Sequence, residues 1–131
     1  MQPSRTVWNA PVTEAIHADG APVAVGSYPH ARRSGNLLFL SGIGPRSAAD
    51  NSIPGNVYDS AGKLQRYDIA AQCRSVLANV RTVLESAGVG WNDLIDVTVY
   101  LTDMANDFPT YNRIWADYFP DAGQAPCRTT L

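Results

Sequence analysis

The residues best suited to chemistry in this 131-residue sequence stand near its C-terminal end. There Pro126 precedes Cys127, Arg128 and Thr129. This run predicts a loop that passes into an extended segment, because the residue before a proline avoids helical backbone and threonine favours strands. An arginine at such a junction can present a planar fork of N–H donors to a carboxylate. The alternative is a surface arginine beside a sheet, and this stretch alone leaves both interpretations open.

A second group of polar and aromatic side chains precedes a turn signal at residues 35–36. If this stretch is extended, Tyr28, His30 and Arg32 share one face. That face either lines a pocket or meets solvent on an edge strand, which Pro29 suits. The pattern favours neither interpretation over the other.

Composition excludes several classes of function. The net charge is −2 and no run of basic residues occurs, so a nucleic-acid surface built on charge is not expected. No apolar run is long enough to cross a membrane, and the N-terminus lacks the apolar core of a signal peptide. We therefore expect a cytoplasmic protein with no membrane partner.

Metal and cofactor chemistry are not expected either. The two cysteines, Cys73 and Cys127, form no CxxC motif, and there are only two histidines. Cys73 falls on an apolar helical face and is expected in the core. The single lysine, Lys63, stands in a glycine-containing loop, whereas a Schiff base needs a lysine in a desolvated pocket. The sequence thus predicts neither a zinc site nor bound pyridoxal.

The elements that position these residues follow from hydrophobic periodicity. We expect strands at 28–33, 37–42, 94–101 and 129–131, helices at 68–87 and 107–118, and a long loop at 43–67 with a short strand near 56–58. Asp68 is the expected N-cap of the first helix, and Asn106 or Asp107 that of the second. Val7-Trp8 can begin a further edge strand. This order predicts an α+β fold with both helices on one face of a mixed sheet, and another copy of the chain on its other face.

Six short motifs, taken in order, resemble the RidA (YjgF-type) family. They are residues 26–30, 37–42, 68–72, 97–104, 111–119 and 125–129. The resemblance runs from about Gly26 to the end of the sequence. The sequence of residues 28–33 and the presence of the long segment 51–67 are most similar to the 2-aminomuconate deaminase branch of the family.

The resemblance implies a chorismate-mutase-like α+β fold and a homotrimer with active sites between subunits. It also implies hydrolysis of enamines or imines to carbonyl compounds and ammonia, without metal or cofactor. Carried over by position, Arg128 holds the substrate carboxylate and Tyr28 is the pocket tyrosine. The other residues implied at the substrate are Ser41, Gly42, Asn112, Cys127 and Thr130.

The sequence departs from the family in three places. Cys127 replaces a small non-thiol residue, and the Ser-Gly pair is not followed by the usual Gln. Family members also continue beyond the position of Leu131 with a strand pair whose carboxylate handles water. We therefore treat 1–131 as one domain without that strand pair, and expect the given chain to be incomplete.

These features lead to one main hypothesis and several alternatives. The main hypothesis is a 2-aminomuconate deaminase, which converts its substrate and water to 2-oxo-hexenedioate (4-oxalocrotonate) and ammonia. The second carboxylate of this substrate requires a second cation, for which Arg46 is favoured over Arg32. The alternative for Arg46 is a solvated loop arginine without a role in binding. The alternatives are a general 2-imino acid deaminase, a non-catalytic small-ligand binder or chaperone-like protein, and an RNA-binding or RNA-cleaving protein.

Overall fold

A computed structural model describes residues 13–131 of the chain, so the strand predicted at Val7-Trp8 lies outside the described residues. Three strands form an antiparallel sheet in the order β1 (Thr13–Ile16), β2 (Ala31–Ser34) and β3 (Leu37–Leu40). The β2–β3 hairpin is confirmed, and its turn places Gly35 at φ 58°, which glycine adopts without a steric cost. Strand β1 was not predicted, because it is short and lacks an alternating apolar pattern.

The extended stretch predicted from residue 28 onward is wrong in its first half. Strand β2 begins only at Ala31, so Tyr28 and His30 lie in the loop before it. That loop turns back on itself, since the N–H of Tyr28 donates to the carbonyl of Gly26 over 3.0 Å. Tyr28, His30 and Arg32 therefore do not form one strand face.

Two further strands form a separate parallel pair. Strand β6 (Asp96–Val99) lies beside β7 (Cys127–Thr130), with Asp96 opposite Cys127 and Val99 opposite Thr130. The strand predicted for 129–131 is confirmed, but it begins two residues earlier, so Arg128 lies within β7 and not at a loop-to-strand junction. Strand β6 is shorter than the predicted 94–101, because a 3-10 turn (Trp91–Asp93) precedes it and ends at Leu94.

Both helices are confirmed, with one correction. Helix α2 (Ile69–Ser86) begins at its predicted N-cap, where the Asp68 carboxylate accepts from the N–H of Ala71 over 3.0 Å. Helix α3 (Met104–Tyr118) begins one turn earlier than predicted. Its N-cap is Asp103, which accepts from the N–H of Asn106, so Pro109 lies inside the helix and not in its first turn.

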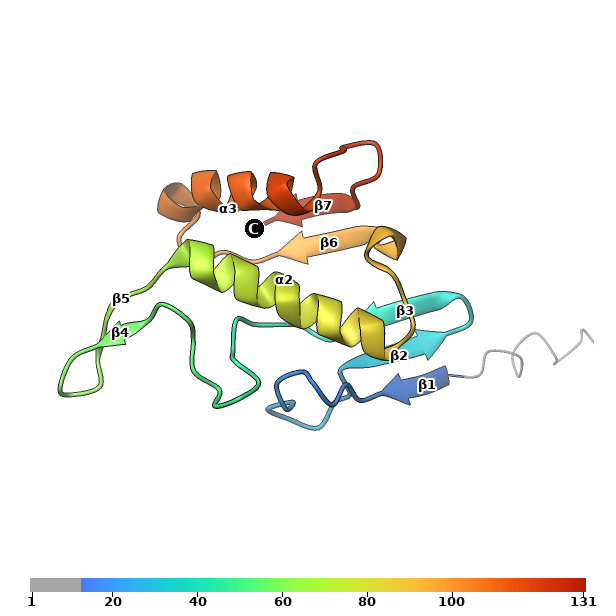
Figure 1. Cartoon of the computed structure of the whole chain (residues 1–131), viewed down its shortest axis with the longest axis horizontal. Helices are drawn as coiled ribbons and strands as arrows, with labels where there is room; N and C mark the ends of the chain where they lie inside the picture. The colour runs from blue at the N-terminus through green and yellow to red at the C-terminus, as the bar shows by residue number, and fades with distance from the viewer. Residues whose placement is uncertain (1–12) are drawn as a thin grey trace, which may run out of the picture.

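Figure 1 shows α2 and α3 on one side of the strands, with α2 lying across the line between β3 and β6. The predicted α+β class and the predicted placement of both helices are therefore confirmed. The strands do not form one continuous sheet, because β1–β3 and β6–β7 are separate ladders. A groove of about 680 Å³ lies between the ladders, lined by α2, α3 and the segment after β3.

The long segment before α2 forms a small hairpin that stands away from the rest of the chain (Figure 1). Strand β4 (Val57–Tyr58) matches the short strand predicted near 56–58, and β5 (Leu64–Arg66) was not predicted. The Asp59 carboxylate closes the turn by accepting from the N–H groups of Ala61 and Lys63.

The fully buried core of the described chain is small. Ala18, Ala21, Ala31 and Val83 form its centre, with Leu38 and Leu40 packed against them. The other two β3 side chains, Leu37 and Phe39, point away and are 51% and 59% exposed. The prediction of a buried strand at 37–42 therefore holds for one face only. The other face of β3 is apolar and uncovered in this chain.

Candidate active site

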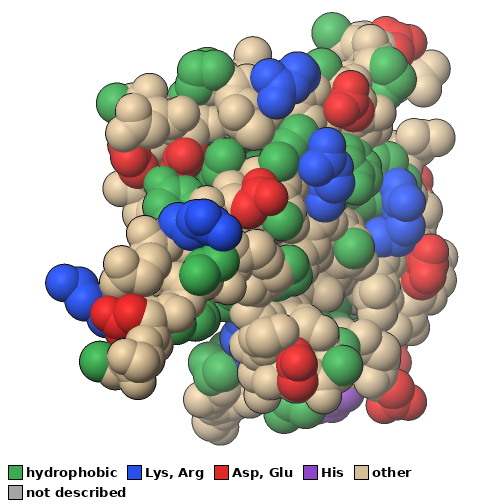
Figure 2. Space-filling model, turned by 60° about the vertical axis from the view of Figure 1, so that its left-hand side comes forward, with side chains coloured by type: hydrophobic (Ala, Val, Ile, Leu, Met, Phe, Trp, Pro, Cys, Tyr) green, Lys and Arg blue, Asp and Glu red, His purple; other side chains and the backbone are tan. Residues whose placement is uncertain are grey.

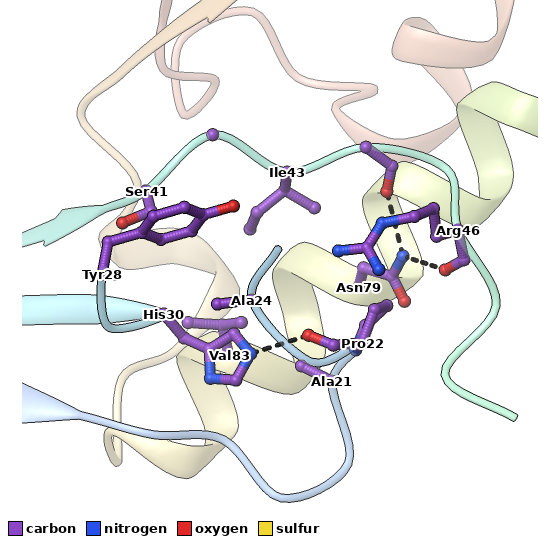
Figure 3. Close-up of a pocket in the computed structure, with 12 residues that line it drawn as sticks. Ala21, Pro22, Ala24, Tyr28, His30, Ser41, Ile43, Arg46, Asn79 and Val83 are labelled. Atoms are coloured by element: carbon purple, nitrogen blue, oxygen red, sulfur yellow. Dashed lines mark hydrogen bonds between the residues drawn. The ribbon is translucent and has the colours of Figure 1, made fainter. Parts of the chain in front are cut away.

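A small cavity lies where β3 ends, under the loop that precedes β2. It is lined by Tyr28, His30, Ser41, Gly42, Arg46 and Asn79, among others (Figure 3). Its volume of about 40 Å³ has room for little more than water, whose share of liquid volume is about 30 Å³. This cavity is therefore too small to enclose an organic substrate by itself.

The loop before β2 holds the strand end that carries Ser41. The N–H of Ser41 donates to the carbonyl of His30 over 3.0 Å, and its hydroxyl donates to the carbonyl of Pro29 over 2.7 Å. Both donors of Ser41 are thus engaged, which leaves its hydroxyl oxygen to accept. The next residue, Gly42, faces open space, because a Cβ built there meets no atom within 4 Å.

Tyr28 lies over the cavity and is 41% exposed. Its phenol oxygen accepts from the N–H of Val25 over 3.3 Å, so the phenol proton stays available to a ligand. The neighbouring His30 is engaged on both ring nitrogens. Its Nδ1 accepts from the N–H of Ala18 (2.9 Å), and its Nε2 lies 2.8 Å from the carbonyl of Pro22. This network assigns the proton to Nε2 and makes His30 a structural residue.

Arg46 points its guanidinium into the same cavity (Figure 3). Its Nη1 donates to Asn51 Oδ1 over 2.8 Å, and its Nη2 donates to the carbonyl of Val23 over 3.0 Å. Both acceptors are neutral, so neither contact compensates the charge of the guanidinium. The guanidinium of Arg46 therefore gives one side of the cavity a positive charge that attracts anions.

Arg128 lies elsewhere, on β7 beneath α3. Its guanidinium carbon is 5.1 Å from the ring centre of Tyr111, 5.2 Å from that of Trp115 and 5.9 Å from that of Phe108. Aromatic faces attract a cation at this range. A cation–π contact uses no N–H donor, so it leaves the N–H groups of the guanidinium available, which suits the carboxylate role predicted for Arg128.

The remaining predicted residues divide between the two faces of β7 and the surface of α3. Thr130 lies on the face of Arg128, and its hydroxyl is 2.9 Å from that of Tyr111. Cys127 is exposed, and its N–H donates to the carbonyl of Ile95 over 2.9 Å. That N–H is therefore not free for a ligand. Asn112 is exposed on α3.

The structure thus divides the predicted site into two groups. Tyr28, Ser41, Gly42 and Arg46 line the small cavity, whereas Arg128 and Thr130 lie against α3. Ser41 and Gly42 also line the large groove, as do Tyr111 and Trp115, two of the rings next to Arg128. Sequence reasoning missed Asn79, whose position on the polar side of α2 gave no sign of a role at the cavity.

A partly buried thiol, Cys73, and a buried carboxylate, Asp107, interact electrostatically. Burial, with the nearby Asp107 carboxylate, raises the pKa of the Cys73 thiol, and Cys73 lines the groove instead of lying in the core. Asp107 is only 6% exposed and accepts from the hydroxyl of Tyr67 over 2.8 Å. This hydrogen bond raises the pKa of Tyr67. Within residues 13–131, no group of three His, Cys, Asp or Glu side chains is placed to hold a metal ion.

Comparison with known proteins gives consistent matches. A family model described as Endoribonuclease L-PSP matches residues 18–131. A RutC family protein of Pyrococcus horikoshii is 39% identical over 112 residues, which are 86% of this chain and 79% of that protein. A 2-iminobutanoate/2-iminopropanoate deaminase of Escherichia coli is 30% identical over 110 residues, 84% of this chain and 76% of that protein.

A solved structure supports the same relationship. The YjgF gene product from E. coli superposes with a TM-score of 0.74 at 29% identity, over 90% of this chain and 84% of that one. The residues matched by the family model include every candidate site residue described above. No helix among the described residues is long and apolar enough to span a membrane.

Proposed function

Because the chain belongs to the Endoribonuclease L-PSP family, which includes the RidA and YjgF proteins, we propose that it is a hydrolytic deaminase of enamines or imines. The likeness to YjgF confirms the chorismate-mutase-like fold that the motifs predicted. A fold by itself does not determine a function, so the proposal rests on the site. A relative that is named as a 2-iminobutanoate/2-iminopropanoate deaminase supports the reaction class.

The observation that carries the proposal is the environment of Arg128. Three aromatic rings hold its guanidinium by their faces, so the fork of N–H groups can receive a substrate carboxylate. An imino acid carries that carboxylate next to the reacting carbon. Binding at Arg128 therefore fixes the position of the carbon that water attacks.

The reaction needs modest assistance once the substrate is placed. An enamine tautomerises to the imine, and protonation of the nitrogen makes the adjoining carbon electrophilic. Water adds to this carbon, and the resulting carbinolamine loses a proton from oxygen as its carbon–nitrogen bond breaks to release ammonia. The phenol of Tyr28 is suited to donate a hydrogen bond to the substrate, and the oxygen of Ser41 is suited to orient the water.

The substrate that we favour is 2-aminomuconate, a dicarboxylate, and Arg46 is the residue that supports this choice. Its guanidinium points into the cavity with its charge uncompensated by its two neutral acceptors. Arg32 is less suitable, because its side chain is exposed on β2 and donates to the hydroxyl of Thr13. A general 2-imino acid deaminase, which needs only Arg128, is the alternative within the class.

We further propose a homotrimer with its active sites between subunits. Tyr28 lines the small cavity of about 40 Å³, whereas Arg128 lies apart from it on β7, against the rings of α3. A neighbouring copy placed over the uncovered apolar face of β3 can complete the site. Asn112, exposed on α3, is available to such a neighbour.

Two alternatives of other classes make different predictions. A small-ligand binder of the same fold binds imino acids but releases no ammonia. An RNA-directed function requires a basic surface, and the chain has a net charge of −2. On the face shown in Figure 2, lysine and arginine side chains stand apart among acidic and apolar groups. This distribution favours a small-molecule substrate.

The direct test is ammonia release from freshly generated 2-aminomuconate beside 2-iminobutanoate. We expect release from both, with a larger kcat/KM for 2-aminomuconate. Release from 2-iminobutanoate alone supports the general deaminase. Saturable binding of both compounds without ammonia release supports the non-catalytic binder and contradicts the proposal.

A further inference from the structure

Two side chains of helix α2 hydrogen-bond to the backbone around Arg46. The hydroxyl of Ser75 donates to the carbonyl of Pro45 over 2.7 Å. The amide nitrogen of Asn79 donates to the carbonyls of Gly44 (3.1 Å) and Arg46 (2.9 Å), as Figure 3 shows. Residues four apart share one face of a helix, so a single face of α2 captures three successive carbonyls.

For residues 44–46, these hydrogen bonds to α2 take the place of the strand-to-strand hydrogen bonds, which end with β3. Strand β3 ends at Leu40, and residues 44–46 belong to no strand. A loop carbonyl outside regular structure needs a side-chain or water partner, and the position of the backbone follows that partner. The path of the chain at Arg46 is therefore set by α2 and not by the sheet.

The other side of Arg46 is fixed by a closed loop. The N–H of Ser47 donates to the carbonyl of Ser52 over 2.8 Å, and the N–H of Asn51 donates to the carbonyl of Ser47 over 2.9 Å. Asn51 has a positive φ of 63°, a conformation that asparagine adopts more readily than most residues. This loop places Asn51 Oδ1 at 2.8 Å from the guanidinium of Arg46.

The hydrogen bonds to these three carbonyls also affect the electrostatic potential in the cavity. Carbonyl oxygens carry partial negative charge, and three of them directed at the cavity would repel an anion beside Arg46. Their hydrogen bonds to Ser75 and Asn79 direct them toward α2 instead. The loop therefore offers the cavity a positive side chain with its own carbonyls turned elsewhere.

We propose that Ser75 and Asn79 are positioning residues that make Arg46 a receptor for the second carboxylate of a dicarboxylate substrate. This inference rests on the proposed function, which assigns Arg46 to the end of the substrate remote from the reacting carbon. We call the hydrogen bonds from Ser75 and Asn79 to the carbonyls of residues 44–46 the clamp. The inference predicts that loss of the clamp weakens binding of the second carboxylate. Recognition of the first carboxylate, at Arg128, stays unchanged.

The test compares binding of two ligands with the same carbon skeleton, measured by isothermal titration calorimetry. Muconate has two carboxylates and sorbate has one, and neither carries the amino group that is hydrolysed. We expect the wild-type protein to bind muconate about tenfold more tightly, as a hydrogen-bonded charged group contributes. Ser75→Ala should abolish this preference and leave the affinity for sorbate unchanged.

The controls lie on the same helix. Ser75→Thr keeps the hydroxyl and should restore the preference. Ser86→Ala removes a hydroxyl that donates within α2, to the carbonyl of Thr82, and should have no effect. In an Arg46→Ala background, Ser75→Ala should cause no further loss, because the clamp acts through Arg46.

Three outcomes overturn the inference. They are equal loss of affinity for both ligands in Ser75→Ala, no loss at all, and a wild-type protein that binds muconate and sorbate equally. Sorbate binding also reports whether each variant is folded. Because neither ligand is turned over, a failure to release ammonia from 2-aminomuconate contradicts the proposed deaminase while this binding test still decides the role of the clamp.

Discussion

Arg128 keeps its guanidinium against three rings of α3, and this arrangement explains how an arginine at a sheet edge can serve a ligand. A salt bridge to a carboxylate of the protein would occupy the N–H fork and neutralise the charge. Cation–π contacts stabilise the same group without using its N–H donors, which remain available to a ligand. The aromatic residues of α3 are therefore part of the proposed carboxylate site.

We predict that Arg128→Ala removes nearly all deaminase activity while the protein stays folded. Loss of a charge-assisted contact to the substrate costs about 2–4 kcal/mol, roughly thirtyfold to a thousandfold in kcat/KM. Arg128→Lys should recover little of it, because an ammonium lacks the planar fork. The measurement is ammonia release by each variant. Wild-type kcat/KM in Arg128→Ala would show that Arg128 is only a surface residue.

The two cysteines should differ in reactivity. Burial, assisted by the charge of Asp107, raises the pKa of Cys73, so its thiolate is scarcer at neutral pH, and the thiolate is the reactive form. Cys127 is exposed on β7. We predict that a thiol reagent labels Cys127 first and Cys73 slowly, as followed by mass spectrometry at pH 7.5. Cys127→Ser should remove the fast phase, and persistence of that phase would contradict the assignment.

At the scale of the elements, hydrophobic periodicity and capping residues predicted the helices and strands well where these are determined by residues close in the sequence. The apolar stripe of α2 and its cap at Asp68 predicted both ends of that helix within one residue. The start of α3 was placed one turn late, because three possible caps follow one another and only Asp103 forms the bond to Asn106. Strand β1 escaped prediction because its pairing with β2 depends on contacts that are distant in the sequence.

Two glycines of the β4–β5 region offer a test of how this hairpin joins α2. Gly62 and Gly55 both have positive φ, at 80° and 84°. A Cβ at Gly62 meets nothing within 4 Å, whereas one at Gly55 would lie 2.5 Å from the Cβ of Asp68, the N-cap of α2. The two positions therefore share the backbone cost of alanine but differ in the steric cost.

We predict that Gly62→Ala lowers the free energy of unfolding by about 1–2 kcal/mol, the cost of the left-handed region for a residue with a Cβ. Gly55→Ala should cost at least about 1 kcal/mol more, because the clash displaces an N-cap of that value. Urea denaturation followed by circular dichroism measures both. Equal losses in the two variants would show that the hairpin moves away from α2 at no cost.

At the scale of the whole molecule, the sequence suggested candidate site residues but not how far apart they lie in one chain. Motif order proposed Tyr28 and Arg128 for one site, and the structure places Tyr28 at the small cavity and Arg128 against the rings of α3. The distance between them depends on the packing of two separate ladders around α2, which no local pattern reports. Asn79 and Ser75 escaped notice for the same reason, since their partners lie about thirty residues earlier in the chain.

The uncovered face of β3 is where the proposed trimer can be tested. Leu37 and Phe39 expose 51% and 59% of their surface on the side away from α2, and their apolar area gains stability only when another surface covers it. In the proposed trimer, a second copy of the chain would cover this face and complete the divided site. A charge placed in that contact would be buried without a partner, which strongly disfavours assembly.

We therefore predict that wild-type protein is a trimer and that Phe39→Asp is a monomer, as measured by light scattering at micromolar concentration. Tyr58→Asp is the matched control, because Tyr58 is also an exposed aromatic residue, at 53%, but lies on the outlying β4–β5 hairpin. It should remain trimeric. The Phe39→Asp monomer should keep its helical circular dichroism and lose deaminase activity, since each site would then lack the neighbour's contribution. A monomeric wild type, or an active Phe39→Asp monomer, would place the whole site within one chain.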